Sequence, residues 1–216
     1  MGKFPQPAVG TRGSLKWIQH FVNEDSAALN GAIGIGDITW LSPLKADGCA
    51  EYRDSDFLNL LKVDLPKESL SSFWPDRGPQ WDAIGRAARG DIVLVEAKAH
   101  VTEVLSPRTK AGEKSVGLIR KSLARTANAL GARLGAVDWS QTFYQYTNRV
   151  AHAHFLHVIN GIPAVLVFLY FVGDKDVDGP ANRREWEAAE IVLHEALGLR
   201  GKIPKYVKSV CLDVPA

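Results

Sequence analysis

The chain contains very little cysteine and no long apolar run. Its two cysteines, Cys49 and Cys211, form neither a disulfide framework nor a zinc-ligand set by themselves, so we expect free thiols in a reducing compartment. The longest apolar stretch, Ile162–Val172, is far shorter than the roughly 20 residues that a membrane-spanning helix needs. The first residues lack the apolar core of a secretory signal. These absences predict a cytoplasmic protein without a membrane partner.

A strong charge of either sign is also missing. The 26 Lys and Arg residues and the 24 Asp and Glu residues leave a net charge of +2, so only the distribution of charge can indicate a nucleic-acid partner. With 216 residues, of which 46% are hydrophobic and 23% charged, the chain fits one globular domain with a sizeable core. We expect a flexible Pro- and Gly-rich arm over residues 1–13 and a single domain over residues 14–216, whose oligomeric state stays open.

Helical and strand patterns alternate along this domain. Apolar residues at helical spacing predict helices over residues 14–30, 50–62, 115–130, 140–160 and 182–197. Short apolar runs predict strands over residues 37–44, 81–85, 92–97, 163–171 and 206–214. The run 163–171 shows no polar alternation, which is typical of a central strand buried on both faces. The pattern predicts an α/β fold with a central mixed β-sheet flanked by helices.

A loop over residues 66–79 precedes the first strand of a predicted hairpin. It carries Phe73 and Trp74. These aromatic side chains either pack into the fold, which is the commoner case, or stack on bases of a bound nucleic acid.

Three charged residues lie in that hairpin, which is otherwise apolar. Asp82 is near the start of its first strand, and Glu96 and Lys98 end the second strand after a turn over residues 86–91. Because strand side chains alternate with period two, Glu96 and Lys98 should leave the same face, with Asp82 close by. Two partly buried carboxylates repel each other unless a cation lies between them, and Mg²⁺ sites are built in this way. The alternative is an exposed Glu and Lys at a strand end, with Asp82 in a turn.

The order of Asp82 followed by Glu96-Ala97-Lys98 resembles the PD-(D/E)xK nuclease superfamily, which has the restriction-endonuclease-like fold. Trp81 stands where the motif has Pro, a departure that the family tolerates. The resemblance covers about residues 50–171. It implies a metal-dependent nuclease that hydrolyses phosphodiester bonds, with DNA favoured over RNA as the partner.

The resemblance also implies roles for single residues. The implied ligands of Mg²⁺ or Mn²⁺ are the carboxylates of Asp82 and Glu96 and the main-chain carbonyl of Ala97. Lys98 would orient the attacking water or stabilise the developing negative charge. Some members of the family have a further carboxylate, for which Glu24 and Glu51 are both candidates.

Two other functions remain open at this point. One is a catalytically silent nucleic-acid-binding or complex-forming protein on the same fold, although such members usually lose an acid or the Lys. The other is a two-carboxylate enzyme such as a glycosidase, in which Lys98 would have no obvious role.

The substrate contacts are predicted from the segments after the hairpin. Seven Lys and Arg residues and a single acid lie between residues 108 and 133, which indicates either a phosphate-binding track or a solvated helix face. In several groups of the family, the helix after the E-x-K strand supplies a polar residue, often Gln. The candidate substrate-binding residues are His100, Arg120, Lys121, Arg125, Gln145 and Arg149.

Overall fold

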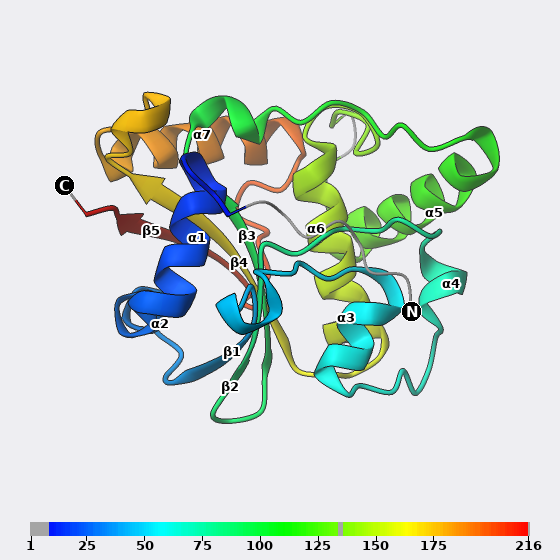
Figure 1. Cartoon of the computed structure of the whole chain (residues 1–216). Helices are drawn as coiled ribbons and strands as arrows, with labels where there is room; N and C mark the ends of the chain where they lie inside the picture. The colour runs from blue at the N-terminus through cyan, green and yellow to red at the C-terminus, as the bar shows by residue number, and fades with distance from the viewer. Residues whose placement is uncertain (1–8, 134–135, 216) are drawn as a thin grey trace.

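A five-stranded mixed sheet lies at the centre of the fold (Figure 1). The computed structural model describes residues 9–133 and 136–215. The strands are β1 (Ile38–Ser42), β2 (Ala83–Ala87), β3 (Ile92–Lys98), β4 (Ala164–Val172) and β5 (Val207–Asp213), in this spatial order. The first three pair antiparallel, whereas β4 pairs parallel with both β3 and β5. The predicted α/β fold with a mixed sheet is confirmed.

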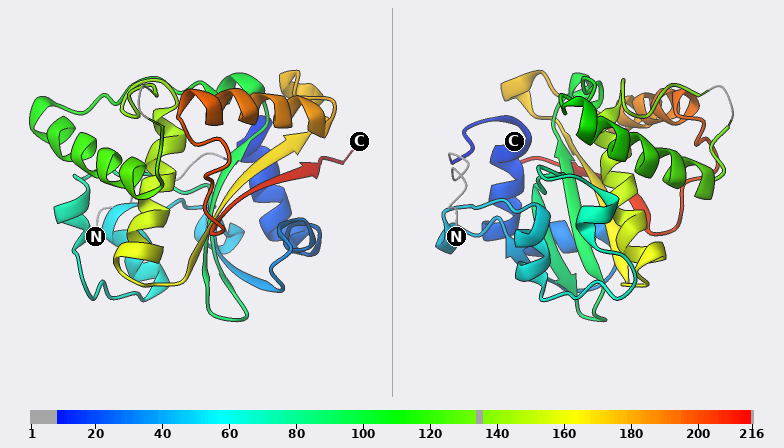
Figure 2. Two further views of the ribbon diagram at one scale, coloured as in Figure 1. Left: turned by 180° about the vertical axis from the view of Figure 1, so that it is seen from behind. Right: turned by 90° about the vertical axis from the view of Figure 1, so that its right-hand side faces the viewer.

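Seven α-helices within the described residues surround this sheet. They are α1 (Gly13–Glu24), α2 (Ser26–Ile33), α3 (Asp54–Leu61), α4 (Leu70–Phe73), α5 (Glu113–Ala129), α6 (Tyr144–His154) and α7 (Arg183–Ala196). Short 3₁₀ helices occur at η1 (Lys45–Asp47), η2 (Val101–Val104) and η4 (Lys175–Val177), and a π-helical turn, η3 (Phe155–Ile159), follows α6. Figure 2 shows α1 and α2 on the opposite side of the sheet from α5, α6 and α7. Within residues 9–133 and 136–215, none of the helices has the length and apolar character of a membrane-spanning segment.

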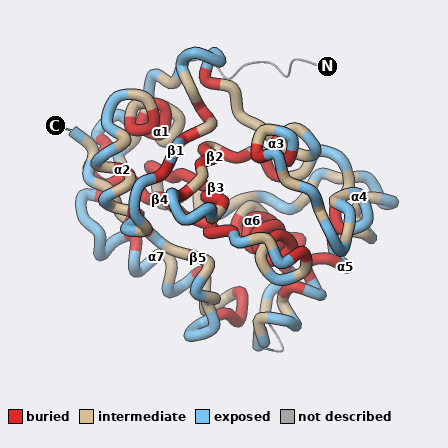
Figure 3. The backbone as a smooth tube through the Cα atoms, turned by 90° about the horizontal axis from the view of Figure 1, so that it is seen from below, coloured by how far each residue is buried: buried red, intermediate tan, exposed pale blue. Residues whose placement is uncertain are grey.

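The sheet separates two apolar clusters. Alternate residues of each strand point to opposite faces and so belong to different clusters. In β3, Val93 and Val95 pack with α1 and α2, whereas Ile92 and Leu94 pack with α5 and α6 on the other face. All nine residues of β4 are buried, which confirms the predicted central strand. The tube in Figure 3 shows these central strands as buried segments between the helices.

Several predicted boundaries differ from the structure. The helix expected over residues 14–30 is divided at Asp25, whose side chain accepts a hydrogen bond from the Ala28 amide and caps α2. Strand β2 continues to Ala87, so the hairpin turn is shorter than expected. Phe73 and Trp74 are buried, and Phe73 stacks on Phe155 at 4.6 Å, so both aromatics pack into the fold instead of facing a base.

The predicted arm lies partly outside the described residues, which begin at residue 9. Within its described part, the Gly10 amide donates a hydrogen bond of 2.8 Å to the side-chain oxygen of Gln19 in α1. Helix α1 then starts at Gly13.

Candidate active site

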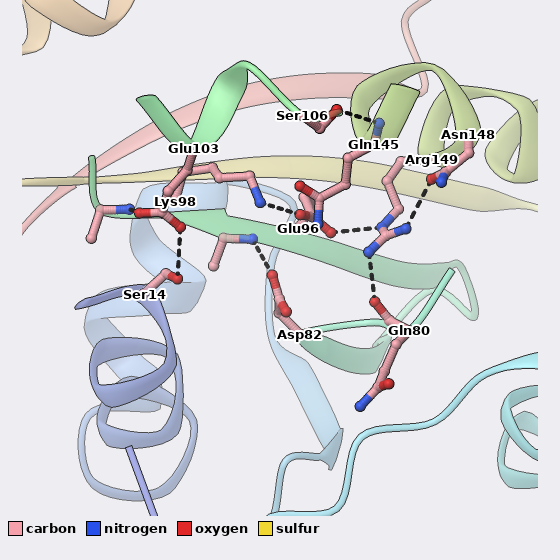
Figure 4. Close-up of polar contacts among 12 residues, drawn as sticks. Ser14, Gln80, Asp82, Glu96, Lys98, Glu103, Ser106, Gln145, Asn148 and Arg149 are labelled. Carbon is pink, nitrogen blue, oxygen red and sulfur yellow. Dashed lines mark hydrogen bonds and ion pairs between the residues drawn. The ribbon is translucent and has the colours of Figure 1, made fainter. Parts of the chain in front are cut away.

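The last residues of β3 place two charged groups against α6 (Figure 4). Glu96 and Lys98 continue the face on which Ile92 and Leu94 pack with α5 and α6, because alternate strand residues share a face. The main-chain pairing of Ala83 with Val95 puts Asp82 opposite Glu96 at the end of the hairpin. The predicted common face of Glu96 and Lys98 is therefore confirmed.

Glu96 is 1% exposed and lies between two cations. Its Oε2 accepts a hydrogen bond of 2.6 Å from Arg149 Nε, and its Oε1 accepts a hydrogen bond from Lys98 Nζ. Burial opposes the charged form of Glu96 most strongly, but the two cations together hold its pKa below the ordinary value. Glu96 is thus a buried, ionised carboxylate.

Arg149 connects this ion pair to the rest of the site. It comes from α6 and donates hydrogen bonds of 2.7 Å to the carbonyl of Gln80 and 2.8 Å to Asn148 Oδ1. Its guanidinium also lies 5.2 Å from the ring centre of Trp81. Arg149, expected as a substrate contact, is 5% exposed and serves as the partner of Glu96.

Asp82 faces a different partner. Its Oδ2 accepts a hydrogen bond of 2.7 Å from the Ala97 amide, and its own amide donates to the Val95 carbonyl at 3.1 Å. Burial first, and then the charge of Glu96, raise the pKa of Asp82 to about 8, against the opposing effects of Lys98 and the Ala97 amide. Asp82 and Glu96 are therefore electrostatically coupled, although each carboxylate is bonded to its own partner.

Glu51 is a third carboxylate within electrostatic range. It is partly buried and accepts a hydrogen bond of 2.7 Å from Gln80 Nε2. Burial raises its pKa, and the charge of Glu96 acts in the same direction. Glu24, the other candidate, instead pairs with Lys45 and His20.

No group of three or more His, Cys, Asp and Glu side chains within residues 9–133 and 136–215 is arranged to hold a metal ion. The charges of the Glu51, Asp82 and Glu96 carboxylates nevertheless act on one another. A metal bound at this place would need main-chain, water or substrate oxygens to complete its ligand set, as Mg²⁺ sites commonly have.

The predicted substrate-binding residues do not all lie beside these carboxylates. Gln145 does, because it lines a small cavity with Glu96 and Lys98. Its main-chain N–H donates a hydrogen bond of 2.7 Å to Ser106 Oγ. His100 does not continue β3, which ends at Lys98, and instead caps η2.

Of the three candidates on α5, two form ion pairs and the third is exposed. Arg120 pairs with Asp138, Arg125 pairs with Glu68 at 2.7 Å, and Lys121 is exposed. Their role in substrate binding stays a prediction.

Gln80 was not recognised from the sequence. It bonds Glu51 through its side chain and Arg149 through its carbonyl, and so links two parts of the site. In the sequence, Gln80 is marked only by its position two residues before Asp82. That position does not indicate a site residue until the contact with α6 is known.

Comparison of the chain with family models, characterised proteins and solved structures finds no match. The resemblance to the PD-(D/E)xK superfamily therefore rests on the residues described above.

Proposed function

We propose that the chain is a metal-dependent nuclease that hydrolyses phosphodiester bonds, with DNA as the favoured substrate. The observation that carries the proposal is the position of Asp82, whose carboxylate bonds the Ala97 amide and is coupled to Glu96. Lys98 stands at the same strand end. An antiparallel β1–β2–β3 meander followed by the parallel strand β4 also agrees with a restriction-endonuclease-like core, which we propose as the fold family.

The residues of the site fit a hard divalent cation. A strand residue directs its N–H and C=O toward the same neighbouring strand, so the Ala97 carbonyl faces the side on which its amide meets Asp82. Burial raises the pKa of Asp82 most and the charge of Glu96 raises it further; a bound cation would oppose the effect of Glu96. The proposed holders of Mg²⁺ or Mn²⁺ are Asp82, Glu96 and the Ala97 carbonyl, with Glu51 as a further carboxylate.

Glu96 can take part although two cations already bond it. A carboxylate offers about four lone-pair sites, and each oxygen of Glu96 uses one in the bonds to Arg149 and Lys98. When bound, the metal would polarise the scissile phosphate and lower the pKa of a water molecule.

The chain's own groups position Lys98. Its ammonium is held by Glu96, whose charge is in turn stabilised by Arg149. This chain of bonds keeps an ammonium donor at the end of β3, where it can stabilise charge that develops on a phosphate oxygen.

The test compares cleavage by the wild type and by the Asp82→Asn variant. Labelled single-stranded, double-stranded and branched DNA and RNA would be incubated with Mg²⁺ or Mn²⁺, and with EDTA as the metal-free control. We expect metal-dependent cleavage that falls about 10²-fold or more in Asp82→Asn, a loss of the size that follows removal of an essential electrostatic group. Glu24→Gln is the matched control, because Glu24 pairs with Lys45 away from the site. Equal cleavage by wild type and Asp82→Asn would overturn the assignment.

One observation favours a second function. Glu96 is neutralised by Arg149 and Lys98, as in a structural ion-pair network, and such a network suits a nucleic-acid-binding protein without catalysis. Binding to nucleic acid that needs no metal, together with no cleavage of any of the substrates, would support this alternative.

A further inference from the structure

Two neighbouring cavities lie beside the candidate site. Their volumes are about 360 Å³ and about 410 Å³. Both are lined by Trp74, Arg77, Thr109, Lys110 and Tyr144, so the two cavities adjoin each other. We call the two adjoining cavities together the basic groove.

The groove has a strong local excess of positive charge. The lining of the first cavity contains Arg77, Arg108, Lys110 and Arg149 but no Asp or Glu, and the second cavity adds only Asp76. The side chains of Arg77, Arg108 and Lys110 are exposed, and none of them forms an ion pair with another described residue. Unpaired cations gathered in a concave surface favour an anionic ligand.

The groove adjoins the candidate active site. Gln80 and Arg149 line it, and Arg149 bonds both the Gln80 carbonyl and Glu96 (Figure 4). Gln145 lines the groove and also the small cavity that contains Glu96 and Lys98. A chain molecule lying along the groove would thus pass beside Gln80 and Arg149, which bond Glu51 and Glu96.

The walls of the groove are held in place by hydrogen bonds. Asp54 accepts from the amides of Arg77 and Gly78 at 3.0 and 2.8 Å, which fixes one loop. The Thr109 amide donates to the Ser140 carbonyl at 3.2 Å and so attaches the other loop. The cations therefore stand on anchored main chain, which lowers the entropy cost of binding.

An aromatic ring accompanies the cations. Tyr144 is partly buried, lines both cavities and stacks on the buried Trp74, with ring centres 6.5 Å apart. A backbone track of Lys and Arg next to an aromatic ring is the combination that binds single-stranded nucleic acid, because unpaired bases can stack on the ring. In a duplex the base faces are covered by their neighbours.

We propose that the basic groove binds one unpaired strand of nucleic acid and leads it to the active site, a proposal that rests on the proposed nuclease function. The phosphates would lie against Arg77, Arg108 and Lys110, and a base would lie against Tyr144. Of the basic residues between 108 and 133, only Arg108 and Lys110 line the groove.

The test measures binding without cleavage. Fluorescence anisotropy with a labelled single-stranded oligodeoxynucleotide, in EDTA and over a series of NaCl concentrations, gives Kd and its salt dependence. For Arg108→Ala/Lys110→Ala we expect binding about tenfold weaker and a salt slope smaller by about 1.4, which is about 0.7 for each phosphate that the variant no longer neutralises. The matched control is Arg184→Ala/Lys205→Ala, which removes two exposed charges that line neither cavity and should bind like the wild type.

A blunt duplex of the same sequence supplies the second comparison. We expect the wild type to bind it about tenfold more weakly than the single strand, because stacked bases cannot reach the ring. Equal affinity of the groove variant and the wild type would overturn the proposal, and so would tighter binding of the duplex.

The outcomes separate this proposal from the nuclease assignment, since the binding assay contains no free metal. Metal-dependent cleavage with unaltered binding in the groove variant would refute the groove alone. Groove-dependent binding without cleavage of any substrate would refute the nuclease assignment alone.

Discussion

The two faces of β3 have opposite characters although they belong to one strand. The face toward α1 and α2 is apolar along its length, through Val93, Val95 and Ala97. The face toward α6 begins with Ile92 and Leu94 and ends with Glu96 and Lys98. One face serves packing only, whereas the other combines packing with a buried ion-pair network. Changes on the two faces should therefore have different consequences for stability and for activity.

The largest effect on stability is expected from removing the cation that neutralises Glu96. In Arg149→Ala, the buried carboxylate keeps only Lys98 as a partner, and breaking a buried ion pair costs about 3–5 kcal/mol in unfolding free energy. Urea denaturation followed by circular dichroism measures the loss. Arg120→Ala breaks an exposed pair with Asp138 and should cost less than about 1 kcal/mol. Similar costs for the two variants would mean that the buried network stabilises the fold no more than an exposed ion pair does.

The next effect concerns the apolar face. Leu169 in β4 is fully buried in the cluster with α1 and α2, and its main chain pairs with Ala97. We expect Leu169→Ala to lower the unfolding free energy by about 2–5 kcal/mol, because the cavity it leaves does not fully collapse. Oligonucleotide binding per folded molecule should stay at the wild-type value, since no charged group moves. A variant that remains folded but loses binding would contradict this separation of the faces.

The sequence predicted those features of the two faces that depend on the short-range pattern of apolar and polar residues. Period-two alternation placed Glu96 and Lys98 on one face, and the absence of alternation marked β4 as a buried strand. The pairing of Glu96 with Arg149 could not be predicted in this way, because 53 residues separate them and their contact depends on how α6 crosses the sheet. The sequence indicated Arg149 as a substrate contact and not as the partner of Glu96.

Local capping decided other differences. The apolar pattern over residues 14–30 is continuous, yet Asp25 ends one helix and starts another because its side chain accepts from the Ala28 amide. Competition between an Asp side chain and the helical main chain is a matter of tenths of a kcal/mol to about 1 kcal/mol, which a hydrophobic pattern does not record.

His152 gives the α6 side of the sheet a stability that depends on pH. Burial among Phe73, Trp74 and Trp81 lowers the pKa of His152 from 6.5 to about 3, and Arg149 adds to this, although the bond with the Asn148 carbonyl opposes it. The unfolded chain therefore binds a proton that the folded chain rejects. Its contribution to stability is complete above pH 6.5 and is lost as the pH falls toward about 3, by up to about 1.4 kcal/mol per pH unit.

Urea denaturation at a series of pH values tests this contribution. The difference in unfolding free energy between wild type and His152→Gln should change with pH below 6.5 and be constant above it. A difference that is independent of pH over the acidic range would show that His152 is already protonated in the folded protein.

The smallest effect is expected at the cap of α2, on the apolar side. Asp25→Ala removes the acceptor of the Ala28 amide and should cost about 1 kcal/mol in unfolding free energy. The matched control on the other side is Asn182→Ala, which removes the corresponding cap of α7, an acceptor for the Arg184 amide. Both variants should retain wild-type oligonucleotide binding, because neither cap touches the basic groove or Glu96. If Asp25→Ala alone weakened binding, the α1–α2 side would contribute to function, and the two faces of β3 would be less separate than their residues indicate.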